Sequence, residues 1–165
     1  MFHRNPTELA KTLAPRQRLL GLDVGSKTVG LALSDTTRRV ATPHMTLHRT
    51  KFAKDVDTLL ALIAREGVGG LVIGLPLNMN GSEGPRCQSV RQFARNLDER
   101  IDVGMAFWDE RLSTAAVERV LIEADTSRQR RKQVIDKLAA AYILQGAMDS
   151  LRGAIDSGAL ESEAR

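Results

Sequence analysis

The chain has 165 residues, which suits one domain with a buried core. Its apolar content of 42% and charged content of 27% are ordinary for a globular domain, and no apolar run reaches the roughly 18 residues of a membrane-spanning helix. A net charge of +4 permits a polyanionic partner, whereas an aromatic content of 4% argues against a base-stacking surface. If a nucleic acid binds, we expect contacts with its backbone phosphates.

The chain contains a single cysteine, Cys87, which excludes an intramolecular disulfide and fits a reducing compartment. The N-terminal residues lack the apolar stretch of a secretory signal, so we expect a cytoplasmic protein. The three histidines are far from Cys87 in sequence, which disfavours both thiol catalysis and a structural zinc site.

The first half of the chain contains three apolar segments typical of β-strands, joined by short turns. These predicted strands cover residues 18–24, 28–34 and 41–49. Pro43 favours an edge position for the third strand, because proline cannot donate a ladder hydrogen bond. Apolar residues at helical spacing then predict a helix over 51–67, with Gly67 placed to end it. A short helix is also expected over residues 6–13.

The second half of the chain alternates predicted strands and helices. The strands cover 68–76 and 101–108, and the helices cover 85–100, 115–124 and 134–151. The predicted order is therefore β-β-β-α-β-α-β-α-α, which favours an α/β fold. We expect a mixed five-stranded sheet, its first three strands antiparallel, flanked by helices on both faces. The domain is expected over residues 18–152, between an N-terminal extension of residues 1–17 and a polar C-terminal tail of residues 153–165.

Acidic residues lie at three places where a carboxylate is costly. Asp23 interrupts an apolar strand, and Gly25 lets a ligand approach it closely. Asp109 and Glu110 close another apolar strand, and strand alternation directs them to opposite faces. Asp136 lies on the apolar, small-residue stripe of the last helix, where a carboxylate needs a cation.

Each acidic position by itself also has a purely structural interpretation. Asp23 could cap the amides of the following turn, Arg111 could pair with either acid beside it, and Lys132 or Lys137 could pair with Asp136. Considered together, the three positions favour a shared site for Mg²⁺ or Mn²⁺, which prefer oxygen ligands. Such ions support phosphodiester hydrolysis by activating water and stabilising the leaving oxygen.

Two further segments suggest contacts with a substrate. A basic run precedes Asp136 and could hold phosphates, although a solvated helix start explains it equally well. This run consists of Arg128, Arg130, Arg131 and Lys132. The glycine-rich loop "GLPLNMNGSEGPR" over 74–86, with Arg86 near a helix start, matches no nucleotide-binding motif, but its length after a buried strand suggests substrate contact.

Four stretches in order carry a family resemblance that covers roughly residues 18–152. They read "LGLDVGSKTVGLALSD", "VIGLPLNMNGSEGPR", "WDERLST" and "RQRRKQVIDKLAAAYILQGAMDS". At these stretches the chain resembles the YqgF (RuvX) family of pre-16S rRNA nucleases, also described as Holliday-junction-resolvase-like. The resemblance implies an RNase H-like fold, divalent-metal nuclease chemistry and a role in maturing the 5′ end of 16S rRNA in ribosome biogenesis.

The resemblance also implies which residues form the site. The acidic triad that holds the metal would be Asp23, Glu110 and Asp136, with Asp109 beside it. Supporting or substrate-contacting positions would be Lys27, Arg86, Arg111, Ser113 and Thr114. The strand "GGLVIGLP" lacks the acidic ligand that better-understood RNase H-like nucleases often carry there. The site could therefore hold one metal ion or two.

Alternative functions also follow from the sequence. The expected partner is structured RNA or a ribosomal precursor particle, but a Holliday junction resolvase acting on branched DNA would use the same chemistry. A non-catalytic rRNA-binding assembly factor is a further alternative. The stretch "GLDVGSKTVGLALSD" also resembles the first phosphate loop of actin-like and sugar-kinase ATPases, but 165 residues are expected to leave no room for their second domain.

Overall fold

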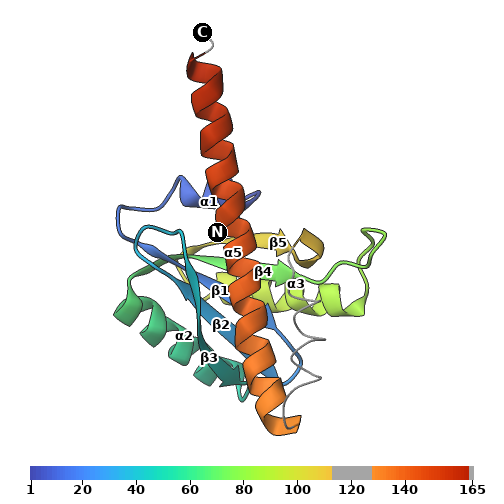
Figure 1. The fold of residues 1–165 in the computed structure, drawn as a ribbon. Coiled ribbons are helices and arrows are strands. Elements are labelled where there is room, and N and C mark those ends of the chain that lie inside the picture. Colours follow the sequence, from blue (N-terminus) through green and yellow to red (C-terminus); the bar gives the residue numbers. More distant parts are fainter. Residues whose placement is uncertain (113–127, 164–165) are drawn as a thin grey trace.

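The structure is a computed structural model that describes residues 1–112 and 128–163 (Figure 1). A five-stranded mixed sheet forms its centre, with the strands in the order β3-β2-β1-β4-β5. The strands are β1 (Arg18–Val24), β2 (Thr28–Ser34), β3 (Ala41–His48), β4 (Val68–Leu75) and β5 (Gly104–Asp109).

The pairing of the strands confirms the predicted mixed sheet. Strands β1, β2 and β3 are antiparallel to one another, whereas β4 pairs in parallel with both β1 and β5. Strand β3 lies at one edge, as predicted from Pro43. Pro43 pairs with Ala32 where the ladder shifts register, and such an irregularity at an edge strand accommodates a residue that has no N–H group.

Helices cover both faces of the sheet (Figure 1). They are α1 (Pro6–Ala10), α2 (Phe52–Glu66), α3 (Pro85–Asp98), the short 3₁₀ helix η1 (Glu110–Leu112) and α5 (Arg128–Glu163). Gly67 ends α2 in the left-handed conformation with φ of 63°, as expected of a helix C-cap glycine. The helix predicted over 115–124 lies outside the described residues.

The last helix is longer than predicted. It begins at Arg128 and runs 36 residues to Glu163, so the basic run and most of the segment predicted as a polar tail are helical. The sequence beyond residue 152 is polar but contains Ala, Leu and Glu, which are good helix formers, and no proline. Polarity therefore did not mark the end of this helix.

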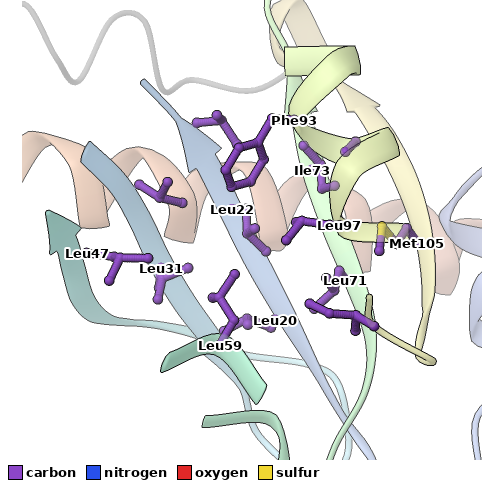
Figure 2. Close-up of a cluster of buried hydrophobic side chains, with 14 of the residues drawn as sticks. Leu20, Leu22, Leu31, Leu47, Leu59, Leu71, Ile73, Phe93, Leu97 and Met105 are labelled. Carbon is purple, nitrogen blue, oxygen red and sulfur yellow. The ribbon is translucent and has the colours of Figure 1, made fainter. Parts of the chain in front are cut away.

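Two hydrophobic cores hold the layers together. Leu20, Leu22 and Leu31 point toward α2 and α3, where they pack in the core that contains Leu59 and Phe93 (Figure 2). On the opposite face, residues of alternate position in the same strands pack against α5 in a second core of smaller side chains. This alternation places the odd-numbered residues of β1 and the even-numbered residues of β2 beneath α5.

Glycines bring α5 unusually close to the sheet. A Cβ atom built on Gly30 would lie 1.9 Å from the carbonyl oxygen of Asp136, and one on Gly21 would lie 2.9 Å from that of Ala140. No larger residue fits at either position without displacing backbone. Gly30 pairs with Asp23 in the β1–β2 ladder, so the contact sets the start of the described part of α5 directly beside Asp23.

The N-terminal residues are attached to the sheet. The amide of His3 donates to the carbonyl of Met105, and the amide of Met105 donates to the carbonyl of Met1, at 2.7 and 2.9 Å. Phe2 pairs in parallel with Met105, so this segment covers part of the exposed edge of β5. In the described parts of the chain, no helix is long and apolar enough to cross a membrane.

We expect Gly30→Ala to destabilise the protein, because its methyl group would overlap the carbonyl of Asp136. Overpacking of this kind costs about 1–3 kcal/mol, and more where the obstacle is backbone. Gly153→Ala is the matched control, since nothing lies within 4 Å of a Cβ there and alanine favours a helix by roughly 0.5–1 kcal/mol. Chemical denaturation would measure both, and equal stability of the two variants would contradict the packing argument.

Candidate functional site

Asp23 lies near the carboxyl end of β1 and is only 4% exposed. Side chains alternate between the two faces of a strand, so Asp23 lies on the face that α5 covers, as do Leu19 and Gly21. The guanidinium of Arg86 approaches it, with Nη2 standing 4.0 Å from Asp23 Oδ1. Because burial of a carboxylate is costly, a position such as this favours a site for additional positive charge.

The backbone of Asp136 on α5 lies over Gly30, which pairs with Asp23 in the β1–β2 ladder. The hydroxyl of Thr28, the first residue of β2, donates to Asp136 Oδ2 at 2.5 Å. Thr28 and Gly30 lie on the same face of the sheet. The contact with Gly30 sets the distance of α5 from the sheet, and the hydrogen bond from Thr28 orients the carboxylate of Asp136. The start of β2 therefore places Asp136 near Asp23.

Glu110 reaches the same face from the other side of β1. It begins η1, directly after the last residue of β5. A Cβ on Gly74 would lie 2.8 Å from Glu110 Oε1 and 2.5 Å from Ile143 Cδ1, so the carboxylate and α5 both lie over this glycine of β4. The absence of a side chain at Gly74 is what leaves room for Glu110 beneath the helix.

Asp109 takes a different direction from Glu110, as strand alternation predicted. The guanidinium of Arg111 donates to both of its carboxylate oxygens, with distances of 2.7–3.1 Å, and the amide of Arg111 donates to Oδ1. These hydrogen bonds hold the pKa of Asp109 below its ordinary value. The pairing of Asp109 with Arg111 is the structural alternative considered for this position.

Arg111 also holds the loop between β4 and α3. Its Nη1 donates to the carbonyl of Met79 at 3.3 Å, and it lies beside Gly81, whose φ is 85°. Within the loop, the amide of Asn78 donates to the carbonyl of Ser82 at 2.9 Å. The loop is thus a compact turn tied to the residues that follow β5, at the same end of the sheet as Asp23.

Basic residues surround this end of the sheet. Arg86 lies in the first turn of α3 with 54% of its side chain exposed, and Lys27 is exposed in the turn between β1 and β2. Both are positioned to meet an anion that approaches Asp23. Ser113 and Thr114 lie outside the described residues, as do the side chains of the basic run Arg128, Arg130, Arg131 and Lys132.

The donors at this site are carboxylate oxygens, the ligand type that Mg²⁺ and Mn²⁺ prefer. Asp23, Glu110 and Asp136 share one face of the sheet at its carboxyl end. Within residues 1–112 and the described part of α5, however, no three acidic, histidine or cysteine side chains are grouped closely enough to form a metal site. The donor chemistry of Asp23, Glu110 and Asp136 fits a hard divalent ion.

Cys87 is outside this chemistry, as the sequence predicted. It is fully buried, and burial followed by its contact with Glu83 raises the pKa of the thiol. A thiol in this state is a poor nucleophile.

Sequence reasoning missed the residues that position the carboxylates. Thr28 and Gly30 attract no attention as candidates, because hydroxyl and glycine residues in strands have many uses, and Gly74 is noted only as a glycine that permits close approach of the backbone. One signal was available: the glycines at 21, 30 and 74 fall on the same face of the predicted strands as Asp23, which indicates that something approaches that face closely.

Comparison with known proteins gives a consistent result. The model of the RuvX family, described as "Holliday junction resolvase", matches residues 17–150. A protein of Paramagnetospirillum magneticum named "Putative pre-16S rRNA nuclease" is 62% identical over 148 residues, covering 90% of this chain and 96% of its own. A protein of the same name from Ruegeria pomeroyi is 58% identical over 145 residues, covering 88% and 94%.

Among solved structures, RuvC of Thermus thermophilus in complex with a Holliday junction substrate has a TM-score of 0.53 at 11% identity. The likeness covers 83% of this chain and 96% of that one. A second Thermus thermophilus RuvC structure gives a TM-score of 0.51 at 9% identity, with 83% and 97% covered. These likenesses concern the fold alone, and they confirm the predicted RNase H-like architecture.

We expect Arg111→Gln to raise the pKa of Asp109 toward its ordinary value of 3.8, because the guanidinium bonds that lower it are lost. A lowered carboxyl pKa adds stability that is present above the unfolded value and is lost as pH falls through the folded value. The stability difference between wild type and variant should therefore shrink below about pH 3.8. NMR titration of Asp109 and denaturation against pH would measure this, with Arg65→Gln as an exposed control. An unchanged Asp109 titration would refute the assignment.

Proposed function

The chain belongs to the RuvX family, and from that premise we propose that it is a metal-dependent endonuclease that hydrolyses phosphodiester bonds in structured RNA. Its substrate would be pre-16S rRNA, alone or in a ribosomal precursor particle, cut near the 5′ end of 16S rRNA during ribosome biogenesis. Relatives at 62% and 58% identity carry the name of this activity, and the alignments cover nearly all of both chains.

The observation that carries the proposal is the approach of Asp136 to Asp23. The backbone of Asp136 lies over Gly30, the ladder partner of Asp23, and its carboxylate accepts from the hydroxyl of Thr28 on the same face of the sheet. Carboxylates that come from distant elements to one end of a sheet face supply the oxygen ligands that a hard divalent ion prefers. A plain helix–sheet contact would not require acids there.

In this proposal Asp23, Glu110 and Asp136 hold the metal, and Asp109 supports the site through Arg111. The ion, Mg²⁺ or Mn²⁺, would activate water and stabilise the leaving oxygen when bound. The protein itself supplies three things: a fixed pair of carboxylates, a closed apolar floor beneath α5, and cations at the rim.

The cations at the rim would orient the phosphodiester. We assign this role to residues whose positions surround the carboxyl end of β1, with the exposed guanidinium of Arg86 nearest to Asp23. Charge-assisted bonds to phosphate oxygens fix the position of the backbone without reading its sequence. The proposed set is Lys27, Arg86, Arg111, Ser113, Thr114, Arg128, Arg130, Arg131 and Lys132.

A second candidate substrate is a four-way DNA junction. The family model is described as a Holliday junction resolvase, and one of the similar folds was solved with such a junction. The much higher identity to relatives named for pre-16S rRNA favours RNA. A non-catalytic rRNA-binding role would leave the approach of Asp136 to Asp23 without a purpose.

The proposal extends to the organisation and location of the protein. We assign the nuclease domain to residues 18–152, between an N-terminal extension over 1–17 and a C-terminal segment over 153–165. A cytoplasmic location agrees with a substrate that is transcribed there and with a single, buried cysteine.

We expect Asp23→Asn, Glu110→Gln and Asp136→Asn each to lower metal-dependent cleavage of a pre-16S rRNA fragment by more than about a hundredfold, because each removes a charged metal ligand. Each variant should keep its circular dichroism spectrum and unfold cooperatively. The exposed Asp57 of α2 supplies the matched control, since Asp57→Asn should cleave like wild type. Full activity of Asp136→Asn would remove that residue from the triad.

We also expect the wild-type protein to cleave a pre-16S rRNA fragment faster than a four-way DNA junction under the same Mg²⁺ or Mn²⁺ concentration. Initial rates on both substrates, measured with one enzyme preparation and with Asp23→Asn as the blank, decide between the two activities. Faster cutting of the junction at symmetric positions would establish the resolvase instead.

A further inference from the structure

A second basic site lies far from the carboxylates, at the place where α5 leaves the sheet. A cavity of about 450 Å³ is bounded there by α1, by the loop between β2 and β3, and by α5. Apart from Ala10 and Leu151, the residues that line it are cationic or carry a hydroxyl, and none of the described lining residues is acidic. These side chains are Thr7, Lys11, Thr37, Arg38, Arg39 and Arg152.

The loop that forms one wall of the cavity is organised from within. The carboxylate of Asp35 accepts hydrogen bonds from the hydroxyl of Thr37 and from the amides of Arg39 and Val40, the latter two at 2.8 and 3.0 Å. These bonds, that of Thr37 foremost, lower the pKa of Asp35 well below its usual range. The acid therefore shapes the loop and remains ionised while the basic side chains face the cavity.

The same loop is fixed to its neighbours. Arg38 adopts a left-handed backbone conformation with φ of 56°, uncommon for a residue other than glycine, and its Nη1 donates to the carbonyl of Gln17 at 2.7 Å. The side chain of Gln145 on α5 donates to the carbonyl of Arg39 and accepts from the amide of Ala41, both at 2.9 Å. Strain that is held in place by several bonds is typical of functional loops.

Three cations of the cavity, Lys11, Arg39 and Arg152, are available to a ligand, whereas Arg38 is bound to the carbonyl of Gln17. Lys11 pairs with Glu8, and Arg152 with Asp149, but all four side chains are about half exposed or more. Exposed pairs of this kind contribute little free energy, so a phosphate can replace the carboxylate. Arg39 is exposed as well.

The cavity stands at a fixed distance from the candidate nuclease site. Asp136 and Arg152 lie on the same helix, and sixteen residues of helix span about 24 Å. Figure 1 shows α5 running straight across the sheet, with α1 beside the part that extends past it. A double-stranded nucleic acid is rigid over this length and carries phosphates throughout.

We infer that this cavity is a second phosphate-binding site, which holds the backbone of the substrate RNA duplex about 24 Å from the phosphodiester being cut. The inference rests on the proposed function for its ligand. It adds to that function a requirement on the substrate: a helical segment on one side of the cleavage position, long enough to reach from Asp136 to Arg152.

The test compares two double variants that remove the same charge. Lys11→Gln with Arg39→Gln changes the cavity, whereas Lys54→Gln with Arg65→Gln changes exposed positions of α2 on the opposite face of the sheet. Both lower the formal net charge of +4 by two. Each double is made in the full chain carrying Asp23→Asn and titrated without divalent metal, so that binding is measured apart from cleavage.

The probes are two RNA hairpins, one with a stem much longer than about 24 Å and one with a shorter stem. For the long stem, we expect the cavity double to lower the slope of log K against log salt by about 1.8, the loss of two phosphate contacts, relative to the control double. For the short stem, the two doubles should bind alike.

Three outcomes would overturn the inference. Equal salt slopes of the two doubles on the long stem would exclude the cavity as a backbone contact. Equal RNA binding, combined with loss of inorganic phosphate binding by the cavity double alone, would assign the site to a free phosphate ligand. Absence of any RNA binding by the parent protein would overturn the proposed function as well, which distinguishes the two failures.

Discussion

The contact between α5 and Gly30 is the constraint on which the rest of the site depends. With the carbonyl of Asp136 lying 1.9 Å from the position of a Cβ on Gly30, the helix is as close to the sheet as backbone can come. That approach is possible only because the β1–β2 hairpin carries glycine opposite Asp23. The missing side chain at Gly30 therefore lets the backbone of Asp136 rest on the residue that pairs with Asp23.

The electrostatics of the site follow from this geometry. Asp23 is almost fully buried, and its neighbour Asp136 adds like charge that apolar packing beneath α5 does not screen. The hydroxyl of Thr28 satisfies one oxygen of Asp136 but brings no positive charge, and Arg86 stands 4.0 Å from Asp23. Under the proposed function, a divalent cation bound between these acids and the solvent would add the positive charge that stabilises both carboxylates.

The sequence was sufficient for most of the fold and only part of the site. Strands β1 and β2 were predicted at their observed limits, because alternation and a glycine turn are local signals, and the acids were found because carboxylates in apolar segments are conspicuous. The contacts of those acids with Thr28 and Gly74 depend on the strand register and on how α5 packs on the sheet. Both are long-range properties that a local sequence pattern does not contain. The end of α5 was misjudged because helix propensity, not polarity, decides where an unpacked helix stops.

One helix connects the two ends of the molecule. Through Gly30 it fixes Asp136, through Gln145 it fixes the loop that bears Arg39, and a helix is stiff over the residues between them. The separation between the acidic site and the basic cavity is therefore fixed by the length of rigid helix between Asp136 and Arg152. If both proposed sites bind one substrate, the protein would distinguish nucleic acids by whether they are rigid over the same length. Such selection needs no contact with the bases, which agrees with a chain that has few aromatic residues and a modest positive charge.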